Sequence, residues 1–300
     1  MTQIRIMALR HSAFYSPLLM TIAAGYLRDE GLEPVYTVAT PTRTVPQSLS
    51  AGECHVAQSA VATSFAALEQ GDKSDIVHFA QINGRDGFFI AAREPDDNFS
   101  WDKLQGKKVL VDHFFQPLAM LKYGLQKQGV QFDSLNVIDA GDVNSMDEAF
   151  RRGEGDYIHQ QGPAPQQLQH DGVGHVVASV GSAVGPVAFS SLCCQREWLT
   201  TAMAQGFMRA YRKSLHYVIH APADDIAASL SAADFFPAIN ADVLSETVKA
   251  YQHLGCWQLN PYIPTSSFES LLDVFLFNKH IQRRYNYSDI VDQSLCQSGG

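Results

Sequence analysis

Two short stretches place aromatic, imidazole and hydrogen-bonding side chains directly before a predicted helix. They are RHSAFYSP at 10–17 and DHFFQP at 112–117. Aromatic rings can stack on a flat ligand, while imidazole, hydroxyl, carboxylate and amide groups can bond its polar edges. The free N–H groups of the following helix lie at the same end. The candidate ligand-binding residues are His11, Ser12, Phe14 and Tyr15 in the first stretch, and Asp112, His113, Phe114, Phe115 and Gln116 in the second.

The same two stretches admit other interpretations. Their aromatic residues could plug the edge of the core at a strand–helix turn. Alternatively, Ser12, His11 and His113 could be catalytic, although the sequence contains no recognisable set of nucleophile, base and orienting group. We favour the walls of a binding pocket, because the two stretches occupy equivalent positions in an internal repeat.

That repeat is an alternation of strands and helices whose order occurs twice. Short apolar runs predict strands at 3–9, 33–39, 54–58 and 75–82, with helices at 17–28, 45–51 and 60–70. A second series predicts strands at 107–112, 136–140 and 155–160, with helices at 117–127 and around 145–152. Short connections between such elements are typical of βαβ units and mainly parallel sheets. The sequence therefore predicts an α/β protein with two Rossmann-like lobes.

Two further apolar runs, 87–93 and 185–194, are interpreted as crossover strands between the lobes. Residues 1–88 and 192–300 would then form a discontinuous first lobe and residues 89–191 the second, with the ligand cleft between them. The last third of the chain predicts helices packed against the first lobe, at 196–219, 223–231, 240–254 and 266–284. Ser266 and Glu269 have the spacing of a capping box at the start of the last helix.

Open α/β sheets bind ligands beyond the carboxyl ends of their strands. This rule adds further loops to the candidate site. They contribute Thr42, Thr44, Ser59, Ala60, Asn83 and Arg85 from the first lobe, and Gly141, Asp142, Gln160 and Gln161 from the second. Arg10 and Arg85 are the candidates for binding an anionic group, although either could instead pair with Asp86 or Asp112.

The sequence gives little support for a metal, a cofactor or a reactive thiol. His216 and His220 lie four residues apart, but no third ligand has a suitable spacing. Phosphate-binding glycine loops and G-x-S-x-G turns are absent. Cys193 and Cys194 lie in a connector that needs small apolar side chains, so we expect them in the core. We therefore predict neither a metal nor a cofactor.

Composition and charge limit the possible partners and compartments. The formal net charge is −9 over 300 residues, which disfavours nucleic acid as a partner. No apolar run approaches the roughly 20 residues that span a bilayer, so no membrane insertion is expected. Residues 3–9 read directly as a strand without a signal peptide, which predicts a cytoplasmic protein as written, or a periplasmic one if a leader was removed. An odd number of cysteines favours a reducing compartment.

Several stretches resemble the type II periplasmic-binding-protein fold, in its sulfonate-, taurine- and thiamine-pyrimidine-related branch. They are AAGYLRDEGLEPVY (23–36), SLSAGECHVA (48–57), LQGKKVLVD (104–112), AFRRGEGDYI (149–158), and SSFESLLDVFLFNKHI with YSDIVD in the last third. The resemblance covers essentially the full length. It implies two lobes, a hinge, one small organic ligand clamped between the lobes, and an ABC transporter permease as a partner.

Two enzymes of this fold also resemble the chain. Alignment with the thiamine-pyrimidine synthase places Ser59 and Thr63 at the positions of its pyridoxal-phosphate lysine and its consumed histidine, so a Schiff base would have no amine here. GRDGFF (84–89) is similar to a stretch of the biphenyl-sulfinate desulfinase, whose nucleophilic cysteine matches Ser12. A leaderless enzyme of this kind, acting on a small aromatic or heterocyclic substrate, is the alternative function.

The favoured function is that of a solute-binding protein that closes on its ligand by hinge motion. Aromatic side chains would wall a flat apolar part of the ligand, and polar groups would bond its edges. Because the candidate set is rich in aromatic residues and poor in basic ones, we expect an aromatic or heterocyclic, pyrimidine-like ligand rather than nitrate or a simple sulfonate.

Overall fold

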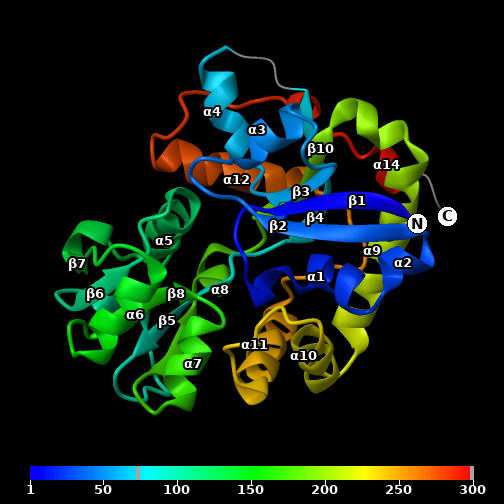
Figure 1. Ribbon diagram of the computed structural model, residues 1–300. Coiled ribbons are helices and arrows are strands. Elements are labelled where there is room, and N and C mark those ends of the chain that lie inside the picture. Colours follow the sequence, from blue (N-terminus) through cyan, green and yellow to red (C-terminus); the bar gives the residue numbers. More distant parts are fainter. Residues whose placement is uncertain (72–74, 298–300) are drawn as a thin grey trace.

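The computed structural model describes residues 1–71 and 75–297 and contains two separate five-stranded sheets (Figure 1). In spatial order, the first sheet holds β2 (Leu32–Val38), β1 (Thr2–Ala8), β3 (Val56–Ser59), β10 (Ser190–Gln195) and β4 (Ile76–Asn83). β1 pairs in parallel with β2 and β3, whereas β10 runs antiparallel to β3 and β4. This sheet is the base of the first lobe.

The second sheet repeats this arrangement with strands from the middle of the chain. In spatial order it holds β7 (Asn136–Ile138), β6 (Lys108–Val111), β8 (Tyr157–Gln161), β5 (Phe88–Ala92) and β9 (His175–Ser179). Its antiparallel member is β5, which pairs with β8 and β9. β1 and β6 therefore occupy equivalent positions, and each sheet receives one antiparallel strand from a connection between the lobes.

Helices cover the sheets of both lobes. The second lobe contains η2 (Trp101–Leu104), α5 (Phe115–Lys127), η3 (Phe132–Ser134), α6 (Val143–Arg151), α7 (Ala164–His170) and α8 (Val180–Val184). Up to β4, the first lobe contains η1 (Ala13–Tyr15), α1 (Ser16–Ala23), α2 (Tyr26–Asp29), α3 (Val45–Ser50) and α4 (Thr63–Glu69). After β10 follow η4 (Arg196–Thr200), α9 (Ala202–His220), α10 (Ala223–Ala232), α11 (Ala241–Leu254), α12 (Thr265–Phe277), α13 (Tyr287–Ile290) and α14 (Ser294–Gln297).

The late helices join the lobes as well as covering the first one. α9 and α10 pack on α1, as the sequence predicted. α11 and α12, however, also contact α7 and α5 of the second lobe. Asn278, directly after α12, donates to the carbonyl of Ala119 on α5 at 3.0 Å. The expectation that these helices serve the first lobe alone was incomplete.

Several predicted elements differ in extent from the structure. The expected helix at 17–28 is divided into α1 and α2, because Gly25 adopts a left-handed φ of 76° that an α-helix cannot continue. The helix predicted at 266–284 ends at Phe277, where Lys279 at φ 57° breaks the helical path. The run at 185–194 becomes a strand only from Ser190.

The structure also lacks a predicted helix cap and contains three elements that were not predicted from the sequence. α12 begins at Thr265 after Pro264 and has no side-chain cap, so the predicted capping box of Ser266 and Glu269 is wrong. α7, β9 and α8 were not predicted. β9 is half-buried along its whole length, and α7 is only seven residues long. Neither gives a strong periodic signal in the sequence.

Candidate functional site

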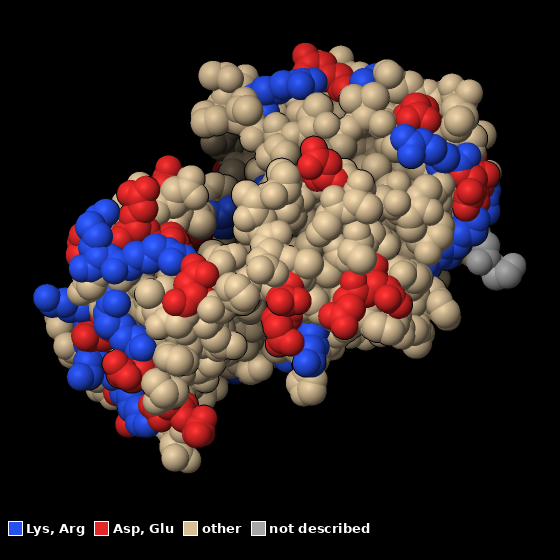
Figure 2. Space-filling view, turned by 60° about the horizontal axis from the view of Figure 1, so that its bottom comes forward, with Lys and Arg blue, Asp and Glu red and all other residues tan. Residues whose placement is uncertain are grey.

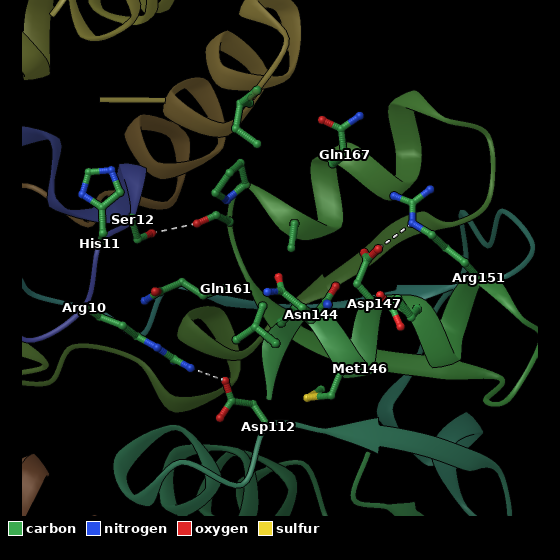
Figure 3. A pocket seen from close by; sticks show the side chains of 17 residues that line it. Arg10, His11, Ser12, Asp112, Asn144, Met146, Asp147, Arg151, Gln161 and Gln167 are labelled. Carbon is green, nitrogen blue, oxygen red and sulfur yellow. Dashed lines mark hydrogen bonds and ion pairs between the residues drawn. The ribbon is translucent and has the colours of Figure 1, made fainter. Parts of the chain in front are cut away.

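An ion pair crosses directly between the two lobes. Arg10 lies in the loop after β1 and Asp112 in the loop after β6, and their Nη2 and Oδ2 atoms are 2.9 Å apart (Figure 3). The other carboxylate oxygen of Asp112 accepts from the backbone N–H of Phe114 at 2.8 Å. Asp112 is therefore fixed by its own loop, while Arg10 reaches it from the opposite lobe.

A cavity of about 460 Å³ lies beside this ion pair. Of the predicted site residues, it is lined by His11, Ser12, Asp112, Gln160 and Gln161. The Gln160 side chain is almost fully buried, yet neither of its amide atoms has a hydrogen-bond partner among the described residues. A buried amide without partners is costly unless something bonds it. Gln160 is therefore the strongest local indication of a bound molecule.

A second, much smaller cavity of about 30 Å³ lies on the other side of Arg10. We call it the aromatic slot, and we call the neighbouring cavity of about 460 Å³ the larger cavity, meaning the larger of these two. Its aromatic and amide lining consists of Tyr15, Gln58, Phe88, Phe114, Gln116, Gln161 and Phe189. Arg10 and Gln161 line both cavities, so these two residues lie at the boundary between the two spaces. The side-chain oxygen of Gln116, Oε1, is also buried without a partner among the described residues.

Ionisable groups near the slot are shifted by burial. Asp86, in the connection between β4 and β5, is fully buried, and this burial raises the pKa of its carboxyl to about 7. Burial also lowers the pKa of His159 on β8 to about 4, which keeps its ring neutral at pH 7. That ring stacks on Phe88 with centroids 4.7 Å apart, and neither nitrogen has a partner among the described residues.

Two predicted aromatic residues lie outside both cavities. Phe14 is completely buried and packs against Tyr251 and Phe189, with ring centroids 4.8 and 5.4 Å away. Phe115 packs against Phe275 and His280, on the side of α5 that faces α12. Phe14 thus plugs the core, which is the alternative that the sequence had left open, while Tyr15 and Phe114 line the slot.

Other predicted residues are occupied elsewhere. Thr42 bonds Thr40 in an exposed turn, and Thr44 caps α3. Ser59 contacts Thr63, while Ala60 lines the slot.

Arg85, Asn83 and His113 also lie apart from the larger cavity. Arg85 donates to the carbonyl of Gly181 and lines a third cavity of about 580 Å³, formed by residues of β5, β9, α8 and α11 among others. Asn83 donates to the hydroxyl of Ser190. His113 contacts the carbonyl of Val111 at 2.8 Å and lies 3.6 Å from Asp139.

The alternative catalytic set is not assembled in this structure. The hydroxyl of Ser12 donates to the carbonyl of Gly162 at 2.7 Å (Figure 3). The His11 ring contacts the hydroxyl of Tyr36 and the carbonyl of Phe235, at 3.0 and 2.7 Å. Neither ring nitrogen therefore serves as a base for Ser12.

Thiol and metal chemistry have no obvious place either. The cysteines are all free and buried, and burial raises the pKa of each thiol. Within residues 1–71 and 75–297, no three His, Cys, Asp or Glu side chains come together as a metal site. His216 and His220 instead pack ring to ring, with centroids 4.5 Å apart.

Sequence reasoning missed one whole wall of the larger cavity. It comes from α6 and the start of α7, and its side chains include Asn144, Met146, Asp147, Arg151 and Gln167 (Figure 3). Arg151 is held by carboxylates, with Asp147 at 2.5 Å and Asp171 at 2.9 Å. Asp142, which was predicted at this loop, caps α6 by accepting from the backbone N–H of Ser145 at 2.8 Å. This capping aspartate was the one sequence signal that α6 begins at the edge of the predicted site.

The surface around the cleft differs between the lobes. In Figure 2, charged side chains of both signs crowd the smaller, second lobe, and much of the larger lobe's visible face is uncharged. A recess separates the two masses in this view. No helix in the part of the chain that the structure describes is both long and apolar enough to cross a membrane.

Comparisons with solved structures define the class of fold. The ligand-binding component of an ABC-type import system from Staphylococcus aureus superposes with a TM-score of 0.74 at 15% identity, covering 100% of this chain and 99% of that one. The periplasmic aliphatic sulphonate binding protein SsuA from Escherichia coli gives 0.73 at 15% identity, covering 99% and 100%. The fold is that of periplasmic binding proteins, which confirms the predicted two α/β lobes.

Sequence comparisons define the family. The Bacillus subtilis (strain 168) protein named "Putative binding protein YtlA" is 26% identical over 302 residues, which span 99% of this chain and 90% of that protein. The sequence model of the NMT1/THI5-like family matches residues 13–225. The chain belongs to this NMT1/THI5-like family.

Proposed function

We propose that the protein is the solute-binding component of an ABC-type importer and holds a small aromatic or heterocyclic molecule between its lobes. The observation that carries this proposal is the pair of adjoining cavities at the carboxyl ends of β1, β6 and β8, with the unpartnered amide of Gln160 in one of them. The family and the names of the relatives support the same function. An importer's permease would be the partner.

The lining favours a flat, uncharged or cationic ligand with hydrogen-bonding edges. Tyr15, Phe88, Phe114 and Phe189 supply aromatic surface, and glutamine amides supply both donors and acceptors. The two arginines at the larger cavity are already paired with carboxylates. A simple sulfonate or nitrate would have to compete with those carboxylates, so a pyrimidine-like ring fits the lining better. The larger cavity has the size of a small-molecule site.

Closure by hinge motion belongs to the same proposal. The first lobe would comprise residues 1–88 and 192–300 and the second residues 89–191, moving about the segments that precede β5 and β10. Ligands that bind in an interlobe cleft gain contacts from both sides only when the lobes approach. The Arg10–Asp112 ion pair already joins the two lobes across the cleft in this structure.

Native mass spectrometry of the purified protein tests this function, followed by denaturation to identify any released compound. We expect a stoichiometric, chemically unchanged aromatic or heterocyclic molecule. Gln160→Leu should lose it, whereas the matched control Gln105→Leu, on an exposed residue of the second lobe, should retain it. A covalent adduct, or a mixture of substrate and product, would contradict the proposal and favour an enzyme.

If the purified cleft is empty, thermal-shift screening with pyrimidines, aromatic acids and sulfonates replaces the first measurement. Stabilisation by ring compounds that is lost in Gln160→Leu supports the proposal, because ligand binding to the folded state raises the unfolding temperature. Stabilisation by simple sulfonates alone would contradict the aromatic assignment.

A further inference from the structure

The guanidinium of Arg10 occupies a site with the features of a cation receptor. A carboxylate oxygen of Asp112 lies 2.9 Å from Nη2. The guanidinium carbon lies 5.1 Å from the ring centroid of Phe114 and 5.8 Å from that of Phe88. Aromatic faces together with a carboxylate are the groups that bind a flat organic cation. In this structure, the protein's own side chain fills that position.

The two partners of the ion pair are held unequally. Asp112 is fixed because its second oxygen caps the backbone N–H of Phe114, and its side chain is 7% exposed. Arg10 is 26% exposed, and its side chain donates one hydrogen bond within the described residues, the bond to Asp112. The Arg10 side chain is therefore the partner that can move out of the ion pair, whereas the Asp112 carboxylate stays beside the rings of Phe88 and Phe114.

Leaving would also unite the two cavities. Arg10 lines both the larger cavity and the aromatic slot, as does Gln161. The slot alone holds about 30 Å³, which is too small for a ring and close to the volume of one water molecule. Displacing the guanidinium would open it toward the larger cavity and the unpartnered amide of Gln160.

We propose that Arg10 is a built-in occupant of the ligand's own subsite, and that the ligand presents a planar, N–H-bearing cation of the amidinium type to Asp112, Phe88 and Phe114. This inference rests on the proposed function and names the chemistry of its ligand. The incoming cation replaces the guanidinium in kind: an N–H group donates to the Asp112 oxygen that now accepts from Arg10, and its plane lies against the rings. Arg10 swings outward toward solvent.

The charges near the cavity favour a cation over an anion. Among the described residues, three carboxylates line the larger cavity, those of Asp112, Asp147 and Glu148, but only two guanidinium groups, those of Arg10 and Arg151. An anion bound to Arg10 would leave the nearly buried carboxylate of Asp112 without its cation, which is costly. A cation bound to Asp112 leaves the more exposed Arg10 to be solvated.

The test uses three probes of nearly the same shape, benzamidine, benzamide and benzoate, which are cationic, neutral and anionic at pH 7. Isothermal titration calorimetry measures their affinities for the full-length wild type, Arg10→Gln, Asp112→Asn and Phe114→Leu. Thermal unfolding of each variant verifies that it is folded. Phe114 is half exposed, so Phe114→Leu should fold even if a change to the ion pair does not.

We expect benzamidine to bind the wild type more tightly than benzamide, and benzoate not to bind. Arg10→Gln should strengthen benzamidine binding about tenfold, since a competitor that fills most of the sites is removed. Asp112→Asn and Phe114→Leu should each weaken it about tenfold or more.

Three results would overturn the inference. Benzoate binding that is lost in Arg10→Gln would make Arg10 an anion receptor. Equal binding of benzamidine and benzamide to the wild type, Arg10→Gln and Asp112→Asn would leave ring binding intact but show that the ion pair plays no part. Binding of none of the probes at millimolar concentration, by wild type or Arg10→Gln, would exclude a flat-cation subsite, while the compound released in native mass spectrometry would still decide the proposed function.

Discussion

The loops after β1 and β6 share a sequence pattern but place their aromatic side chains in opposite environments. After β1, Phe14 and Tyr15 are 0% and 5% exposed. After β6, Phe114 and Phe115 are 49% and 46% exposed. The two strands hold equivalent positions in their sheets. The difference in exposure therefore arises from the element that follows each loop and from the side chains that pack over it.

Local structure explains the first half of this difference. After β1 the chain forms the 3₁₀ turn η1, with Ser12 capping the N–H of Phe14, before α1 begins. This turn directs Phe14 inward, beneath α11 and against Gly87. After β6 a short loop of residues 112–114 leads directly into α5, with no 3₁₀ turn between, and its N-cap Phe114 remains half exposed. Phenylalanine thus becomes core at position 14 and cavity wall at position 114.

The largest expected effect is on stability, at Phe14. Phe14→Ala should lower the free energy of unfolding by about 3–5 kcal/mol, the usual cost of removing a fully buried phenylalanine ring. Urea denaturation measures this value. Phe114→Ala is the matched control and should change it by less than about 1 kcal/mol, because that ring is half exposed. Equal losses in the two variants would break the contrast between the loops.

A second contrast concerns two aspartates in the same local setting. Asp86 and Asp112 each accept from the backbone N–H two residues later, of Phe88 and Phe114. Asp112 is paired with Arg10, whereas Asp86 is fully buried and has an oxygen without a partner among the described residues. Because burial raises the pKa of Asp86 to about 7, the folded state holds a proton that the unfolded chain releases near pH 4.

Asp86 should therefore make the protein less stable as the pH rises from about 4 to 7. Asp86→Asn keeps the acceptor for Phe88 and removes the titration, so it should raise stability at pH 8 by roughly 2–4 kcal/mol and flatten this part of the pH profile. Thermal unfolding between pH 4 and 8 measures both effects. A decline between pH 4 and 7 that persists unchanged in Asp86→Asn would assign it to other groups.

A smaller effect is expected on ligand affinity at Phe114. Once native mass spectrometry has identified the ligand, Phe114→Ala should weaken its binding about tenfold, or by about 1.4 kcal/mol, through loss of one aromatic wall. Phe115→Ala is the control, since Phe115 packs on Phe275 away from both cavities. Calorimetric titration compares the two variants. A greater loss of affinity in Phe115→Ala would place the ligand elsewhere.

The smallest effect is expected at Thr42, which the sequence had placed in the site. Its hydroxyl contacts only the hydroxyl of Thr40 within the described residues, in an exposed turn. Thr42→Ala should change the free energy of unfolding by less than about 0.5 kcal/mol and leave ligand affinity unchanged. Denaturation and titration of the same sample test both points. A clear loss of affinity would mean that this loop closes over the ligand.

The repeated strand–helix order was readable from the sequence because it depends on local signals. Apolar runs mark β1 and β6, and their alternation with helices predicts parallel sheets that bind ligands at one edge. For this reason the sequence could nominate His11, Ser12, Asp112, Gln160 and Gln161, all of which line the larger cavity. β9 and α7 escaped notice because their burial is partial and their length short.

The tertiary structure alone decided which candidates line the two cavities. Phe14 is covered by Tyr251 of α11, which lies more than two hundred positions away in the chain. The encounter of Arg10 with Asp112 likewise joins residues from different lobes. Sequence periodicity reports which face of an element is apolar, because that pattern repeats within a few residues. It cannot report which distant element covers a loop, since that depends on how the two lobes and the late helices pack.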